Sequence, residues 1–165
     1  MSLVKRLGLA GLGGAAAIAA GTVMYFEGHE PDAYVDPVGV VTICYGHTAT
    51  ARIGQTHSDE ECERLLEEDL GDAFDAVDEH VEVDLPPTRE AALASFVYNV
   101  GEGAFERSTL LRLLNAGHWR AACDELMRWV YADGRRLRGL VTRRQTEREL
   151  CLMQPDTMVA GDRDE

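Results

Sequence analysis

The sequence has little positive charge for its length. It carries 16 lysines and arginines against 29 aspartates and glutamates among 165 residues, a formal net charge of -13. A nucleic-acid-binding protein needs a basic stripe that neutralises phosphates, and none is present. We therefore expect no nucleic-acid partner. Hydrophobic residues make up 45% of the chain, so one globular domain with a full core is expected.

The motifs of metal and nucleotide enzymes are also missing. The five histidines include no HExxH spacing, and the four cysteines are too far apart for a CxxC metal site. No GxSxG elbow, P-loop or GxGxxG motif follows a strand and opens a helix. The sequence therefore predicts neither a metal site nor a cofactor.

The cysteines allow two interpretations. In a cytosolic protein Cys44, Cys62, Cys123 and Cys151 would be small buried apolar residues. In an exported protein they would form disulfides, and four cysteines allow three connectivities. The compartment of the chain decides between the two.

An uncharged apolar run covers residues 7–26, directly after Lys5 and Arg6. At about 1.5 Å per residue it is long enough to span a bilayer, but over half of it is Gly and Ala, so lipid would hold it weakly. Three interpretations stay open: a signal peptide cleaved near Ala17 to Ala19, a permanent anchor, and a segment that inserts and later leaves the membrane. The basic start places the rest of the chain on the periplasmic side.

Helical spacing predicts a mainly helical chain beyond residue 57. Ser58 and Glu61 form a capping box for a first helix. Thr88 is expected to cap a second helix, which is apolar on most sides, ends at Gly101 and forms the spine of the domain. Further helices are expected over residues 108–114, 119–131 and 139–153, with Trp129 in the core. The arginines and glutamates of the last helix are expected to form surface ion pairs.

Residues 26–48 put two carboxylates and a hydroxyl into a short span of turn and strand signals. Glu27 follows two aromatic residues, and an apolar neighbourhood would raise its pKa by disfavouring the charged form. Asp36 lies in a Val-Asp-Pro-Val-Gly turn, where it is expected to be accessible and ionised. Thr42 lies on the next strand, on the opposite face from Val41 and Ile43, where it can hold a water beside Asp36.

One protonated and one ionised carboxyl group, held apart, are what cleavage of a glycosidic bond needs. Taken singly, Glu27, Asp36 and Thr42 are ordinary turn and strand residues, and their spacing alone does not establish an active site.

Their order resembles the active-site signature of the phage-type lysozymes, glycoside hydrolase family 24. The signature reads Glu, eight residues, Asp, five residues, Thr, followed by Tyr-Gly-His-Thr at 45–48. Further blocks are similar in the same order: Phe-Val-Tyr-Asn-Val-Gly at 96–101, Ser-Thr-Leu-Leu at 108–111 with Leu-Asn at 114–115, and Gly-Leu-Val-Thr-Arg-Arg at 139–144 with Glu-Arg at 147–148. The apolar start is similar to that of the signal-arrest-release endolysins of this family.

The resemblance implies an α+β, lysozyme-like fold with a small strand-rich lobe over about residues 34–54, a larger helical lobe and a cleft between them. It divides the chain into a signal-arrest-release segment (1–26), a catalytic domain (27–153) and a polar acidic tail (154–165). The implied activity is that of an endolysin, an N-acetylmuramidase that hydrolyses the β-1,4 bond between N-acetylmuramic acid and N-acetylglucosamine in peptidoglycan and so lyses the host cell.

The resemblance also implies roles for single residues. Glu27 protonates the leaving oxygen, Asp36 activates water or stabilises positive charge on the sugar, and Thr42 positions that water, with inversion at the anomeric carbon. His47, Asn99 and Arg143 match family blocks, and for them substrate contact is the alternative to a structural role. Proximity in the family's fold pairs Cys44 with Cys62 and Cys123 with Cys151.

The expected partners are peptidoglycan and, through residues 1–26, the inner membrane, to which the exported monomer is tethered before its release into the periplasm. The acidic charge departs from the usual basic character of these enzymes. Because peptidoglycan is itself anionic, long-range attraction to the substrate is not expected. The alternative function is a lysozyme-like protein that binds wall glycan without cutting it. A pore-forming lysis protein is disfavoured, because a large helical domain is superfluous to it.

Overall fold

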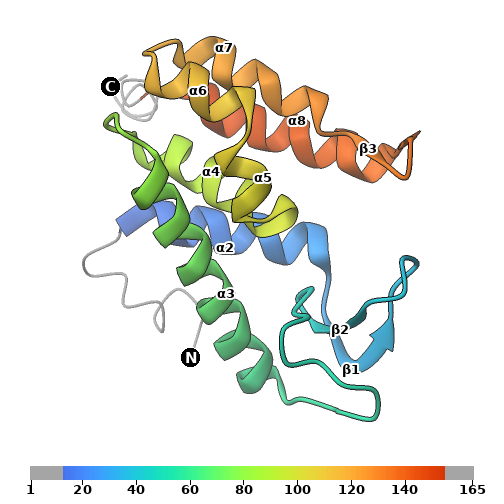
Figure 1. Cartoon of the computed structure of the whole chain (residues 1–165). Helices are drawn as coiled ribbons and strands as arrows, with labels where there is room; N and C mark the ends of the chain where they lie inside the picture. The colour runs from blue at the N-terminus through green and yellow to red at the C-terminus, as the bar shows by residue number, and fades with distance from the viewer. Residues whose placement is uncertain (1–12, 155–165) are drawn as a thin grey trace, which may run out of the picture.

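The computed structural model describes residues 13–154 and shows a mainly helical chain with two small antiparallel sheets. Helix α2 (Gly13–Glu27) crosses the middle of the molecule and packs against α4 (Pro87–Val100) (Figure 1). Strands β1 (Glu30–Val35) and β2 (Val41–Cys44) follow α2, and with their connecting turn they form the strand lobe. Helix α3 (Asp59–His80) leads from the strand lobe back along α4. The expected α+β arrangement of a small strand lobe and a larger helical lobe is confirmed.

The second half of the chain packs on the other side of α4. It consists of α5 (Glu102–Glu106), α6 (Thr109–Asn115), α7 (Trp119–Glu125) with a short 3-10 turn, a hairpin of β3 (Tyr131–Ala132) and β4 (Arg135–Arg136), and α8 (Arg138–Leu152). The prediction of one helix over 119–131 is wrong. Asp133 and Gly134 have φ of 49° and 72°, the positive values that a two-residue hairpin turn requires, so the chain reverses there.

The predicted helix boundaries are right at α3 and wrong at the start of α4. Ser58 and Glu61 form the expected capping box, with the Ser58 N–H donating to Glu61 Oε2 at 2.7 Å. Thr88 does not cap α4, because Pro86 is the N-cap and Pro87 opens the helix, where a missing N–H costs nothing. Gly101 ends α4 as expected, with a φ of 85°.

Helix α4 is the predicted spine of the domain. Residues around most of its circumference are buried: Ala91, Ala92, Leu93, Ala94, Phe96 and Val97. Its neighbours α2, α3 and α8 cover it from different sides. The residues that α4 and α8 share at their interface are therefore withdrawn from water.

The apolar N-terminal segment contributes to this core. Helix α2 buries small side chains against α4 and α3, namely Ala15, Ala16, Ala19, Ala20 and Val23, none more than 5% exposed. Within residues 13–154 no helix combines the length and the hydropathy that a bilayer span requires, so the expected transmembrane helix is not found there. Residues 1–12 of the predicted segment, and the predicted tail from residue 155 onward, lie outside the described residues.

Both disulfides that the resemblance implies are present. Cys44 is bonded to Cys62, which ties the strand lobe to α3, and Cys123 is bonded to Cys151, which ties α7 to α8. The bridges close loops with sequence separations of 18 and 28 residues. On the chain-entropy account each contributes about 3 kcal/mol to the free energy of unfolding. The fold is therefore more stable in an oxidising compartment, where both disulfides can form and persist.

Candidate active site

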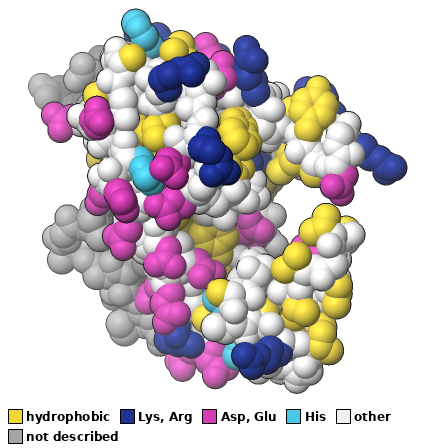
Figure 2. Space-filling view, viewed as in Figure 1, with side chains coloured by type: hydrophobic (Ala, Val, Ile, Leu, Met, Phe, Trp, Pro, Cys, Tyr) yellow, Lys and Arg dark blue, Asp and Glu magenta, His cyan; other side chains and the backbone are white. Residues whose placement is uncertain are grey.

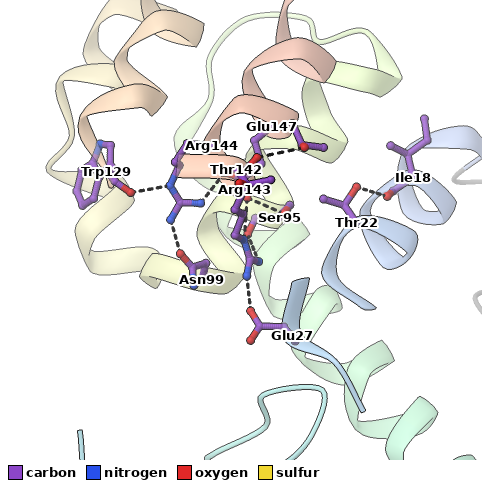
Figure 3. A network of polar contacts seen from close by, with 11 residues as sticks. Ile18, Thr22, Glu27, Ser95, Asn99, Trp129, Thr142, Arg143, Arg144 and Glu147 are labelled. Carbon is purple, nitrogen blue, oxygen red and sulfur yellow. Dashed lines mark hydrogen bonds and ion pairs between the residues drawn. The ribbon is translucent and has the colours of Figure 1, made fainter. Parts of the chain in front are cut away.

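Glu27 is the last residue of α2, at the point where the chain turns into the strand lobe. Its Oε1 accepts a hydrogen bond from Nη1 of Arg143 (Figure 3). Its Oε2 lies against Gly46, where an added Cβ would come within 2.9 Å of that oxygen. The apolar setting expected from the aromatic neighbours is not found, because Tyr25 is 78% exposed and the carboxylate contacts a guanidinium.

Behind Glu27 lies a buried ionic network between α4 and α8. Arg143, Arg144 and Glu147 are 4%, 1% and 0% exposed. The Glu147 carboxylate accepts hydrogen bonds from Arg143 Nε at 3.1 Å, Arg144 Nη1 at 2.6 Å and Ser95 Oγ at 2.8 Å. The expectation of surface ion pairs is wrong for these residues, because α4 covers the face of α8 that carries them. The network fixes Arg143, and Arg143 fixes Glu27 (Figure 3).

The second arginine of the network joins the last turn of α4 and the segment before β3 to it. Arg144 Nη2 donates to Oδ1 of Asn99, and its Nε donates to the Trp129 carbonyl at 3.0 Å. Burial lowers the pKa of the Arg144 guanidinium, and the charge of Glu147 opposes that shift. For Asn99 this geometry favours the structural role over substrate contact. The Trp129 ring packs edge-on against Phe96 at 5.2 Å between centroids, in line with its expected place in the core.

The strand lobe carries the other two candidate residues. Asp36 closes the turn between β1 and β2, because its Oδ1 accepts from the backbone N–H of Val38 at 3.0 Å and of Val40 at 2.8 Å. Among the described residues its Oδ2 has no hydrogen-bond partner. Thr42 is 5% exposed and its hydroxyl donates to the Val40 carbonyl at 3.3 Å. It pairs across the hairpin with Tyr34.

Tyr34 lies within the electrostatic influence of both candidate carboxylates. Burial raises the pKa of its hydroxyl, and the negative charges of Glu30, Glu27 and Asp36 raise it further. Tyr34 is not among the residues that the sequence predicts for the site, although its place opposite Thr42 in the hairpin register was a usable signal.

His47, which follows Gly46, is buried with 4% of its surface exposed. Its Nδ1 lies 2.8 Å from Asp69 Oδ2 and its Nε2 lies 2.8 Å from Thr50 Oγ1. Burial raises the pKa of Asp69, and the hydrogen bond with His47 opposes that shift. Because both ring nitrogens contact protein groups, the geometry favours a structural role for His47.

A pocket of about 240 Å³ adjoins Glu27 on the side of Gly46, which belongs to its lining. Asp69, Tyr98 and Glu102 also line it. The Tyr98 hydroxyl donates to the Tyr45 carbonyl at 2.6 Å, and burial together with the charges of Asp69 and Glu27 raises its pKa. Figure 2 also shows a hollow between the strand lobe and the part of the molecule that carries β3 and β4.

Within residues 13–154, one group of side chains has the proximity that a metal site needs. The ligand atoms of Glu79, His80 and Glu102 lie within 4.8 Å of one another. His80 Nε2 is 2.9 Å from Glu102 Oε1, an ion-pair distance at the protein surface. None of the candidate active-site residues belongs to this group.

Known proteins are similar to this chain over most of its length. The sequence matches the family described as phage lysozyme over residues 24–147. It is 44% identical over 158 residues to the SAR-endolysin of Enterobacteria phage P21, covering 92% of this chain and 96% of that protein. The muramidase domain of SpmX from Asticaccaulis excentricus has a TM-score of 0.76 and 33% identity, covering 82% of this chain and 95% of that domain. The active form of the P1 phage endolysin Lyz shares the fold, with a TM-score of 0.81, 23% identity and coverage of 97% of this chain and 95% of that protein. Because the match spans most of the chain and includes Glu27, Asp36, Thr42 and Arg143, the chain belongs to the phage lysozyme family.

Proposed function

We propose that the chain is an endolysin that hydrolyses the β-1,4 bond between N-acetylmuramic acid and N-acetylglucosamine in peptidoglycan. Membership of the phage lysozyme family supports a glycoside hydrolase. The observation that carries the proposal is the Glu27 carboxylate, which Arg143 holds on one oxygen and the Gly46 backbone confines on the other. A fixed carboxyl group beside a pocket is what a general acid for glycosidic cleavage requires.

The hydrogen bonds of the two carboxyl groups support a different role for each of their oxygens. Oε1 of Glu27 accepts from Arg143, so the proton that reaches the glycosidic oxygen is carried by Oε2. Oδ1 of Asp36 is engaged by two backbone N–H groups, so Oδ2 accepts the proton of the attacking water or faces the positive charge on the sugar. Thr42, on the strand beside Asp36, positions that water. One water is consumed, and its hydroxyl adds to the anomeric carbon as the sugar alcohol leaves.

Product analysis tests this function. Purified peptidoglycan is digested with the full-length chain and reduced with borohydride, which marks every new reducing end. We expect reduced N-acetylmuramic acid. Reduced N-acetylglucosamine would identify the wrong bond, and binding of glycan without any new ends would identify the alternative, a lysozyme-like protein that does not cut.

We further propose that the chain is exported, tethered to the inner membrane by residues 1–26 and then released into the periplasm. The name SAR-endolysin of the P21 relative supports this route. Cleavage between Ala17 and Ala19 is disfavoured, because it would remove the part of α2 that buries Ala15 and Ala16 in the core.

Tethering is expected to inactivate the enzyme. Glu27 ends α2, so a helix held in lipid would separate its carboxylate from Arg143 and Gly46, and catalytic geometry fails at an error of about 1 Å. Membrane and soluble fractions of expressing cells, matched for protein, are compared on purified cell walls. Full activity of the lipid-bound fraction would contradict this regulation.

Gly46→Ala is expected to lower kcat on peptidoglycan about 100-fold, because the new Cβ would displace the Glu27 carboxylate from its position. Gly46 has a φ of 80°, and the added atom would lie 2.9 Å from Oε2. Gly54→Ala is the matched control, since Gly54 has a φ of 92° and nothing within 4 Å of the added atom. Both variants should lose similar thermal stability, and only Gly46→Ala should lose activity. Equal activity of the two variants would show that Gly46 does not confine the acid.

A further inference from the structure

Tyr98 on α4 holds the turn that follows β2. Its hydroxyl donates to the Tyr45 carbonyl at 2.6 Å, a contact between residues 53 positions apart in the chain. Burial raises the pKa of this hydroxyl, the charges of Asp69 and Glu27 raise it further, and the charge of Arg143 opposes the shift. The phenol therefore keeps its proton at neutral pH and stays a hydrogen-bond donor.

That turn runs from Ile43 to His47 and is closed by two backbone hydrogen bonds. The N–H of each of these residues donates to the carbonyl of the other at 2.9 Å. The first half of the turn is tied to α3 through the Cys44–Cys62 disulfide, and its last residue is tied to the same helix through Asp69. Both ends of the turn are therefore anchored to α3, whereas its middle is held from α4.

The middle of the turn is the peptide unit between Tyr45 and Gly46. A peptide unit is planar, so the oxygen that Tyr98 holds and the nitrogen of Gly46 move together. Glycine adopts φ of either sign at little cost, so the residue itself does not select the φ of 80° that Gly46 has. The Tyr98 hydroxyl favours that value, because rotation of the peptide unit would break its hydrogen bond.

The Gly46 backbone is one of two contacts that fix the Glu27 carboxylate. A Cβ added to Gly46 would lie 2.9 Å from Oε2 and 3.2 Å from Cδ of Glu27. The other contact is Arg143, whose Nη2 donates to the carbonyl of Ser95 at 3.2 Å. Ser95 and Tyr98 are three positions apart on α4 and so lie on the same face of that helix. Helix α4 therefore supports both oxygens of Glu27, Oε1 through Arg143 and Oε2 through the turn.

We propose that Tyr98 is a positioning residue whose hydroxyl keeps the Gly46 backbone against Oε2 of Glu27, the oxygen that carries the proton in the proposed function, on which this inference rests. The Tyr98 hydroxyl acts through the turn, because its own proton is donated to the Tyr45 carbonyl. Tyr98 also lines the pocket beside Gly46, so contact of its ring with the substrate is the competing role. The two roles predict different changes in kcat and KM.

The test replaces Tyr98 by phenylalanine in the full-length chain, which removes the hydroxyl and keeps the ring. We expect kcat on peptidoglycan to fall about tenfold and KM to change by less than about twofold, because the acid is misplaced while the glycan contacts remain. Ser108→Ala is the matched control. The Ser108 hydroxyl caps α6 by accepting from the Leu111 N–H at 3.0 Å, so this variant also loses one hydroxyl hydrogen bond. It should unfold at a lower temperature and keep the wild-type kcat wherever it is fully folded.

A double variant measures whether Tyr98 acts through Gly46. Gly46→Ala alone already displaces the Glu27 carboxylate, so adding Tyr98→Phe to it should lower kcat by less than about a further twofold. Added to Gly54→Ala, where nothing lies within 4 Å of the new Cβ, Tyr98→Phe should cause the same loss as in the wild type.

The position of the carboxylate can also be followed without catalysis. The carboxyl carbon of Glu27 gives an NMR resonance in protein labelled at glutamate, and its absence from Glu27→Gln assigns it. This resonance should shift in Tyr98→Phe, because the Gly46 backbone beside the carboxylate moves. It should stay in place in Ser108→Ala.

Wild-type kcat in Tyr98→Phe would overturn the proposal. So would a loss that multiplies fully with that of Gly46→Ala, because the hydroxyl would then act elsewhere. A raised KM with unchanged kcat would make Tyr98 a substrate contact instead. A wild-type chain that releases no new reducing ends would contradict the proposed function, and the Glu27 resonance would still show whether Tyr98 positions its carboxylate.

Discussion

Glu27→Gln is expected to lower kcat on peptidoglycan about 1,000-fold while the protein stays folded. Glutamine keeps a side-chain oxygen that can accept from Arg143, but its amide N–H is too weak an acid to protonate the glycosidic oxygen. A general acid contributes roughly 100- to 10,000-fold to such reactions, and the remaining binding groups are untouched. Turbidity clearing of outer-membrane-stripped cells and release of new reducing ends measure the loss.

The control for this substitution is Glu106→Gln, an exposed carboxylate on α5 whose removal changes the net charge equally. It should retain wild-type activity. Binding of Glu27→Gln to insoluble glycan should persist, because the hollow and the pocket beside Gly46 keep their shape. If the Glu27→Gln protein releases new reducing ends at the wild-type rate, Glu27 is not the acid and another group protonates the leaving oxygen. If neither protein releases new ends, the chain is the non-cutting glycan binder.

Features that depend on a few neighbouring residues could be predicted from the sequence. The capping box of Ser58 and Glu61 is one such feature, and the end of α4 at Gly101 is another. Glu27, Asp36 and Thr42 lie in a segment where the structure has a helix end followed by a hairpin, two features that depend on residues near one another in the sequence. The roles of these three residues stay predictions.

Features that depend on packing between distant elements were missed. Arg143, Arg144 and Glu147 look like surface residues, because their charge and spacing on one helix are typical of solvated ion pairs. Only the approach of α4, some 50 residues earlier in the chain, buries them and makes Ser95 and Asn99 their partners. No pattern within α8 alone reports that contact.

The β3–β4 hairpin was missed for a different reason. Its Asp-Gly turn at residues 133–134 is a strong local signal, but the apolar spacing of the preceding helix runs on through Val130 and suggested a longer helix. The environment of Glu27 was misjudged in the same way. Two aromatic neighbours in the sequence suggested an apolar setting, whereas a residue 116 positions away supplies the contact that matters.

Glu147→Gln is expected to lower the free energy of unfolding by about 3–5 kcal/mol, because it leaves the buried Arg144 guanidinium without a carboxylate partner and leaves Arg143 with Glu27 alone. Glu147 is 0% exposed and accepts from both Arg143 and Arg144. Glutamine preserves the shape of the side chain and one oxygen acceptor. The decrease in the free energy of unfolding would therefore come from the missing charge and not from a cavity. For a chain of this size the unfolding temperature should fall by about 10 °C.

The matched control is Glu149→Gln, an exposed carboxylate on the same helix, which should unfold within about 1 °C of the wild type. Activity provides the second measurement. Because Glu147 fixes Arg143 and Arg143 fixes Glu27, Glu147→Gln should also lower kcat at temperatures where the protein is fully folded. Denaturant unfolding of the two variants at neutral pH measures the predicted difference in stability. Equal stability of the two variants would mean that the buried arginines do not need the charge of Glu147. The position of Glu27 would then depend only on Gly46 and the end of α2.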